Sequence, residues 1–188
     1  MYTGKEATEK SFKNLSNLDC SPYILHISTH GFYLPYQPGL TSKGLNNEGQ
    51  SGYYYPFLRT GIVFSGANQS WKDAATLNLP NDGISTAYEI TGMALMNTEL
   101  VVLSACNTGL GDIRDGEGVY GLQRAFRSAG ARSMIMSLSE VPDKETAEFM
   151  TLFYQNWKKD TPKSTAFRKA QVYMSKKYPA SPEKWAGF

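Results

Sequence analysis

Hydrophobic residues along this chain gather in short runs that are typical of strands. Leu100–Leu103 is continuously apolar and half β-branched, and Tyr23–Ser28 and Arg132–Leu138 are predicted to be two further buried strands. An unbroken run of this kind predicts a strand buried on both faces, as in a parallel sheet that helices cover. A shorter strand is predicted over Gly61–Gly66. We therefore expect Leu100–Leu103 to lie centrally in a parallel sheet.

Between these strands the apolar positions follow the spacing of helices. A capping box at Thr86–Glu89 predicts a brief helix that ends near Gly92. Other helices are predicted over residues 5–17, over Gly118–Ala129, from an N-cap at Asp143 to about Lys159, and from an N-cap at Ser164. Residues 31–52 and 67–81 are predicted to be loops. The alternation predicts a single α/β domain, a sandwich with a largely parallel sheet, over residues 1–188.

Composition limits the partners that the chain can be expected to bind. The 188 residues carry 19 basic and 17 acidic side chains, a net charge of +2, which gives no electrostatic case for nucleic acid or a membrane surface. No 18-residue apolar run predicts a transmembrane helix, and the N-terminus lacks the apolar core of a signal peptide. Two cysteines make no disulfide framework. We expect a soluble, cytoplasmic domain.

Two chemically active side chains follow two of the predicted strands. His30 comes just after Tyr23–Ser28, and Cys106 comes just after Leu100–Leu103. Open α/β sheets bind ligands at the carboxyl ends of their strands, so two adjacent parallel strands would bring these side chains to one edge across 76 residues of sequence. The alternative for Cys106 is a buried structural thiol, because free cysteine is among the most buried residue types.

The remaining histidine and cysteine are expected to play no chemical part. His26 is predicted to be a hydrogen-bonded core histidine or a support for the site, and Cys20, in a turn, is expected to be inert. His26 and His30 are four apart on a strand rather than on a helix, and no third ligand is in view, so no metal is expected. The sequence has no P-loop and no dinucleotide fingerprint, and no cofactor is expected.

A thiol and an imidazole at one sheet edge can perform nucleophilic catalysis. The Cys106 thiolate would attack a carbonyl to give an acyl-enzyme, and His30 would protonate the leaving amine and later assist water. Backbone N–H groups of Gly31 and Cys106 are the candidates for binding the oxyanion, and Gly31 permits close approach because it has no Cβ.

Two segments that carry these residues closely resemble the motif blocks of a known family. Ile24–Phe32 (ILHISTHGF) and Leu100–Gly111 (LVVLSACNTGLG) resemble the two blocks of CHAT domains, bacterial relatives of caspases and separases among the cysteine peptidases. The resemblance covers nearly the whole chain and continues through Leu58–Asn68, Gly116–Phe126, Gly130–Ser133, Val141–Asp143 and Trp185–Phe188.

The resemblance implies a caspase-like three-layer sandwich with helices on both faces of the sheet and with His30 and Cys106 as the catalytic dyad. Family domains usually have one more strand at each end, so the chain looks trimmed at both ends. They commonly follow tetratricopeptide (TPR) repeats, so a TPR or other regulatory region is expected in the full-length protein. Two positions depart from the family: Asn107 replaces a frequent glutamate, and Ser139 replaces a frequent tryptophan.

The resemblance also suggests which residues bind substrate. In separase-like relatives an acidic residue after the corresponding strand faces the P1 side chain, and Glu140 and Asp143 fall at that place. Asp112, in the acidic loop after the cysteine, and Ser104, just before it, complete the predicted set. We hypothesise a preference for Lys or Arg at P1; the alternative is that Asp143 only caps its helix and that the loop acids are solvated.

Together these features favour a cysteine endopeptidase that acts on a protein substrate. The main alternative is a catalytically silent interaction module, since caspase-like folds can lose activity and keep a docking role. The intact pair of His30 and Cys106 argues against that alternative. A thiol acyltransferase or a small-molecule hydrolase would use the same two residues.

Overall fold

The computed structural model describes residues 1–17, 20–34, 56–72, 81–104, 112–114, 118–137, 141–157 and 161–188. The chain divides into two compact units, Met1–Met136 and Ser137–Phe188. The first unit contains all the described strands, and the second contains two long helices. The fold is therefore mixed α/β, as the sequence predicts.

The first unit is built on a three-stranded parallel sheet. Its strands are β1 (Ile24–Ser28), β5 (Leu100–Ser104) and β8 (Met134–Met136), in the order β1-β5-β8. All four apolar residues of β5 are buried, so the predicted central, buried strand is confirmed. In β1 burial alternates, with Leu25 and Ile27 inside and the other three residues exposed. The expectation that β1 is buried on both faces is wrong.

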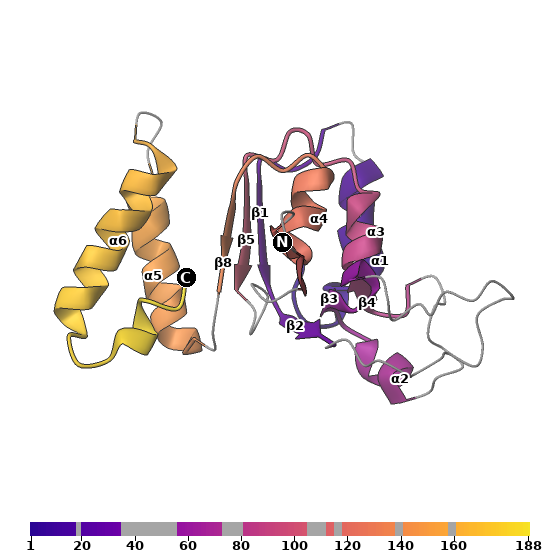
Figure 1. Ribbon diagram of the computed structural model, residues 1–188, viewed down its shortest axis with the longest axis horizontal. Coiled ribbons are helices and arrows are strands. Elements are labelled where there is room, and N and C mark those ends of the chain that lie inside the picture. The colour runs from indigo at the N-terminus through magenta and orange to yellow at the C-terminus, as the bar shows by residue number, and fades with distance from the viewer. Residues whose placement is uncertain are drawn as a thin grey trace, which may run out of the picture. The chain divides into compact units, whose positions relative to one another are not determined.

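A small antiparallel sheet lies at the carboxyl end of the parallel strands (Figure 1). It consists of β2 (His30–Tyr33), β3 (Thr60–Val63) and β4 (Ile84–Thr86), with β3 in the middle. The sequence predicts a loop from residue 31 onward, but β2 continues to Tyr33 because its backbone pairs with β3. The remaining residues of that predicted loop, 35–55, lie outside the described part of the chain.

Residues 118–120, where the sequence predicts the start of a helix, form a strand instead. Strands β6 (Asp112–Arg114) and β7 (Gly118–Tyr120) pair in antiparallel register, with Ile113 opposite Val119. Helix α4 consequently spans Leu122–Ser128 rather than beginning at Gly118. It ends before Gly130, whose φ of 106° is the left-handed conformation predicted for its stop.

Helices α1 (Glu9–Lys13), α3 (Ala87–Thr91) and α4 lie on one side of the parallel sheet (Figure 1). The core between them contains the inward side chains of β1 and β5 and fully buried apolar residues of the helices: Leu25, Ile27, Val101, Leu103, Ile90, Leu122 and Phe126. Helix α3 has the predicted capping box, in which Thr86 and Glu89 exchange hydrogen bonds. The expectation of helices on both faces stays a prediction.

Helix α2 (Ala67–Lys72) falls in a segment predicted as a loop. The described part of the first unit also contains short 3-10 turns: η1 (Gly4–Glu6), η2 (Asn14–Asn17) and η4 (Pro56–Leu58). The turns before and after α1 break the predicted helix over residues 5–17 into three pieces.

The second unit is a helical hairpin of α5 (Asp143–Asn156) and α6 (Lys163–Lys177), followed by the turn η5 (Pro182–Lys184). Its core is aromatic: Phe149 stacks on Phe188 at 5.3 Å between ring centroids and meets Phe167 edge-on at 5.2 Å. The N-caps are Pro142 and Pro162 rather than Asp143 and Ser164, which are the first and second helical residues. Proline has no side-chain oxygen with which to cap a helix, and neither helix start has a side-chain cap hydrogen bond.

No helix among the described residues combines the length and the apolar character that crossing a membrane requires.

Candidate active site

Strands β1 and β5 are paired along their whole length and end at the same edge of the parallel sheet. Their register runs from Ile24 opposite Leu100 to Ser28 opposite Ser104. Neighbouring strands of a sheet lie about 4.8 Å apart. His30 follows Ser28 by two residues, and Cys106 follows Ser104 by the same number. The residues that precede His30 and Cys106 by two positions, Ser28 and Ser104, are thus paired with each other. They lie at the edge of the sheet where open α/β folds bind ligands.

The backbone of His30 is fixed by a second sheet. It begins β2 and lies opposite Val63 of β3, and the hydroxyl of Thr29 donates a hydrogen bond to the Val63 carbonyl oxygen. The His30 side chain itself is exposed. A histidine held by its backbone with its ring open to solvent has the accessibility that proton transfer to a substrate requires.

The other predicted site residues are distributed over both units. Cys106 and Glu140 lie outside the described residues. Gly31 lies in β2, opposite Ile62, and Asp112 begins β6. Asp143 is exposed at the first position of α5, in the second unit, and caps no helix. The interpretation of Asp143 as a helix cap is therefore wrong, because Pro142 occupies that position.

Ser104 contacts His26 across the two parallel strands. The Ser104 hydroxyl lies 3.5 Å from Nε2 of His26, on the face of the sheet opposite the core residues Leu25 and Ile27. His26 is exposed in part, so it is not a core histidine. The surrounding protein still excludes enough water to lower the pKa of its imidazole by desolvation. His26 thus lies near the last residue of β5, in surroundings that favour its neutral form.

This pKa predicts how stability depends on pH. The folded state lowers the pKa of His26 from its ordinary value of 6.5, so below that value the unfolded chain binds a proton more readily than the folded chain does. The free energy of unfolding is therefore expected to fall as pH drops from about 6.5 through the folded-state pKa. Urea unfolding at pH 7.5 and pH 5 measures the loss, and His26→Gln should lose less than the wild type.

A matched control on the same face of β1 is Ser28→Ala, which removes no titrating group and should keep the wild-type pH dependence. Equal losses in the wild type and in His26→Gln would contradict the assigned pKa.

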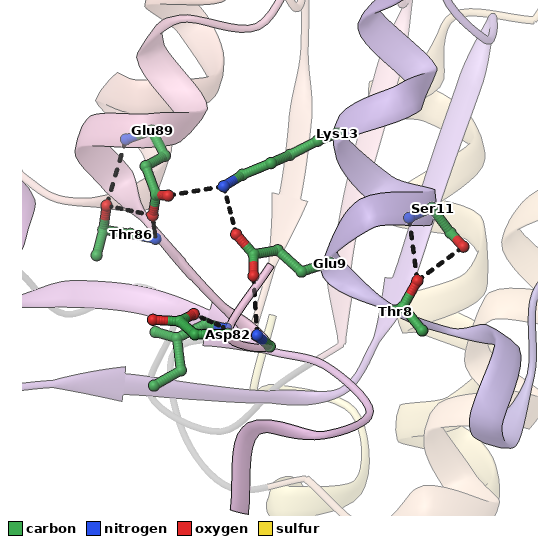
Figure 2. A network of polar contacts seen from close by, with 9 residues as sticks. Thr8, Glu9, Ser11, Lys13, Asp82, Thr86 and Glu89 are labelled. Atoms are coloured by element: carbon green, nitrogen blue, oxygen red, sulfur yellow. Dashed lines mark hydrogen bonds and ion pairs between the residues drawn. The ribbon is translucent and has the colours of Figure 1, made fainter. Parts of the chain in front are cut away.

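Sequence reasoning missed a cluster of charged side chains in the first unit. Glu9 and Lys13 on α1 meet Glu89 on α3 (Figure 2). The spacing of Glu9 and Lys13, four residues apart, could have predicted the first pair. Their partner on another helix could not be predicted, because 76 residues separate Lys13 from Glu89. Within the described part of the chain, no three His, Cys, Asp or Glu side chains gather as a metal site would require.

Comparison with known proteins identifies the family. The model of the CHAT domain matches residues 1–188, the whole of the sequence. The chain belongs to the CHAT domain family. CHAT domains are caspase-like, and the family is associated with folds of the cysteine-peptidase type. The parallel sheet with the paired strands β1 and β5 is the part of this fold from which the two motif blocks extend.

Two curated relatives match nearly the whole CHAT domain. Tetratricopeptide repeat protein 28 of Homo sapiens is 28% identical over 189 residues, which is 98% of this chain and 7% of that protein. The Mus musculus protein of the same name is 26% identical over 98% of this chain and 8% of its own length. The chain therefore spans less than a tenth of the curated relatives that it matches.

Proposed function

We propose that this CHAT domain is a cysteine endopeptidase with His30 and Cys106 as its catalytic dyad. The observation that supports the proposal is the register of β1 and β5, in which Ser28 lies opposite Ser104. Each of the two reactive residues follows one of these paired serines by two positions. The register brings Ser28 and Ser104 to one edge of the parallel sheet although 76 residues separate them in sequence, which supports a site at that edge.

In the proposed reaction the Cys106 thiolate attacks the carbonyl carbon of a peptide bond. The tetrahedral oxyanion accepts hydrogen bonds from the backbone N–H groups of Gly31 and Cys106. His30 donates a proton to the leaving amine as the C–N bond breaks, which leaves a thioester. Water then attacks the thioester, His30 takes its proton, and the acid product and the free thiol are released.

Covalent labelling tests the dyad against the alternative of a catalytically silent interaction module. The protein is treated with an iodoacetamide or acyloxymethyl-ketone probe, and the rate at Cys106 is compared in the wild type and in His30→Ala, with Cys106→Ala giving the labelling that is due to Cys20 alone. Cys20 is a free, exposed thiol in the same chain and provides an internal reference. Labelling confined to Cys20, or a Cys106 rate that does not depend on His30, would favour the interaction module.

We propose in addition that acidic residues select Lys or Arg at P1. Asp143 is exposed at the start of α5, and Glu140 precedes it by three residues; Ser104 and Asp112 are the other proposed contacts. Neutralising Asp143 or Glu140 should lower kcat/KM for substrates with Arg at P1 by about tenfold, the equivalent of about 1.4 kcal/mol. Cleavage after Leu should not change.

Fluorogenic peptides that differ only at P1 measure this preference in Asp143→Asn and Glu140→Gln. Glu183→Gln removes another exposed carboxylate of the second unit and should leave all rates unchanged. Equal cleavage after acidic, apolar and basic residues by the wild type would remove the proposal.

We also propose that the full-length protein joins this domain to TPR repeats, for which the names of the two relatives are the support. The caspase-like family further supports a three-layer sandwich and a protein substrate. A regulatory region of the same chain would then control access to the site or its geometry.

A further inference from the structure

A buried carboxylate outside the proposed site connects the first helix to the antiparallel sheet. Glu9 of α1 is 1% exposed, and its Oε2 accepts a hydrogen bond of 2.8 Å from the backbone N–H of Gly83. Its Oε1 pairs with Lys13, whose Nζ also lies 2.7 Å from Oε1 of Glu89 (Figure 2). Glu89 is itself held by the backbone N–H and the hydroxyl of Thr86, each at 2.8 Å.

The charges of Glu9 and Lys13 favour contact between α1 and its neighbours, Gly83 and Glu89. Burial raises the pKa of Glu9, although Lys13 and the Gly83 amide oppose that effect. Burial disfavours the charge of Lys13 as well, but its bonds to Glu89 and Glu9 outweigh this and raise its pKa. A buried charge that loses its partner is costly. Separating α1 from the strands would therefore remove the Gly83 N–H from Glu9 and the Glu89 carboxylate from Lys13.

The same N-terminal segment holds the end of β3. The backbone N–H of Ser65 donates to the Ala7 carbonyl at 2.9 Å, and the ring of Phe12 stacks on Phe64 at 5.0 Å between centroids. Phe64 in turn donates its N–H to the Gly83 carbonyl at 2.7 Å. Residues 7–13 thus fasten both the end of β3 and the start of β4.

These contacts lie next to Val63, the residue of β3 that is opposite His30. Val63, next to Phe64, pairs with His30 on one side and with Ile84, next to Gly83, on the other. Thr29 adds its side-chain hydrogen bond to the Val63 carbonyl. A continuous set of contacts consequently runs from Glu9 through Gly83 and β3 to the histidine.

We propose that Glu9 and Lys13 are positioning residues for His30, and that docking of α1 on the β3–β4 strands sets the geometry of the site. The inference rests on the proposed function for its catalytic consequence. The parallel sheet has its own ladders, β1 with β5 and β5 with β8, in which α1 takes no part. Displacing α1 is therefore expected to increase hydrogen exchange in β2, the strand that begins at His30, and to leave exchange in the parallel strands unchanged. A regulatory region that binds α1 could then change the geometry of the site.

Two variants of one residue test the positioning role. Glu9→Met removes the acceptor of the Gly83 N–H, whereas Glu9→Gln keeps a carbonyl oxygen for it. Thr98→Val is the matched control, because Thr98 is also fully buried and its hydroxyl donates to the Pro22 carbonyl at 2.8 Å, near the amino end of the parallel strands. Each variant is compared with the wild type by hydrogen exchange and by the rate at which iodoacetamide labels Cys106 relative to Cys20.

In Glu9→Met, amides of residues 30–33, 60–63 and 84–86 should exchange at least tenfold faster, with residues 100–104 unchanged. Labelling of Cys106 should slow at least fivefold, and Glu9→Gln should recover most of both effects. Thr98→Val should not slow labelling. Equal loosening of both sheets, or normal labelling despite a loosened β2, would overturn the positioning role. If His30→Ala leaves labelling unchanged, the proposed function fails, and the exchange of residues 30–33 still decides whether α1 fixes that strand.

Discussion

Replacing His30 with alanine is expected to slow alkylation of Cys106 by about 30-fold at pH 7 and peptide hydrolysis by a larger factor. An unassisted cysteine has a pKa of about 8.5, so roughly 3% of it is thiolate at pH 7. A partner imidazolium that keeps the thiol ionised raises this fraction toward one, which limits the effect on alkylation to about 30-fold. Hydrolysis also needs a proton for the leaving amine, so its loss should reach about 10²- to 10⁴-fold.

The pH profile separates a chemical role of His30 from a structural one. In the wild type the alkylation rate of Cys106 should change little between pH 6 and pH 8. In His30→Ala it should rise about tenfold per pH unit up to the unassisted pKa of about 8.5. Cys20, exposed in the same molecule, serves as the reference at every pH, and His26→Gln serves as the matched histidine variant. A wild-type profile that already follows that of Cys20 would contradict the dyad.

The second large effect is expected from Gly61→Ala in the middle of the antiparallel sheet. A Cβ at Gly61 would lie 2.5 Å from the carbonyl oxygen of Ser85 and 2.7 Å from the Phe32 ring. The first of these atoms is backbone of β4, so relief requires β3 and β4 to separate. Overpacking of a buried site typically costs 1–3 kcal/mol and sometimes more. We expect a loss of about 3 kcal/mol in the free energy of unfolding, measured by urea denaturation.

Two further variants define the cause of this loss. Gly92→Ala is the matched control, because Gly92 follows α3 with a φ of −81° and its nearest neighbour, the Glu89 carbonyl oxygen, would lie 3.4 Å from the new Cβ. It should be neutral or stabilising by less than about 1 kcal/mol. Adding Phe32→Ala to Gly61→Ala should recover the part of the loss due to the ring and leave the part due to Ser85. A Gly61→Ala protein as stable as the wild type would show that the two sheet strands can separate without cost.

Local sequence patterns predict an element correctly where neighbouring residues determine its structure, or where the element is buried along its whole length. The unbroken apolar run of β5 predicted a central strand, and its place between β1 and β8 confirms it. The capping box of α3 needs only Thr86 and Glu89, and both hydrogen bonds are present. The family followed from the two motif blocks, because their residue types are specific.

The errors fall where pairing between distant segments decides the structure. Residues 31–33, predicted as loop, belong to β2, and residues 84–86 form β4, only because both strands pair with β3. The helical spacing of Val119 and Leu122 predicts a helix that includes residues 118–120, but these residues pair with the strand 112–114 instead. Burial of β1 was overestimated because the apolar side chains of Tyr23 and Ile24 are exposed.

The sequence by itself determined the family, the order of the main strands and helices, and the two residues whose chemistry supports a peptidase. The tertiary structure decided that β1 and β5 are neighbours in register, and that a buried glutamate from the first helix fastens the strands beside His30. The physical reason is that hydrophobic period and capping act within a few residues, whereas the pairing of β1 with β5 and the burial of Glu9 depend on groups 74 or more residues apart.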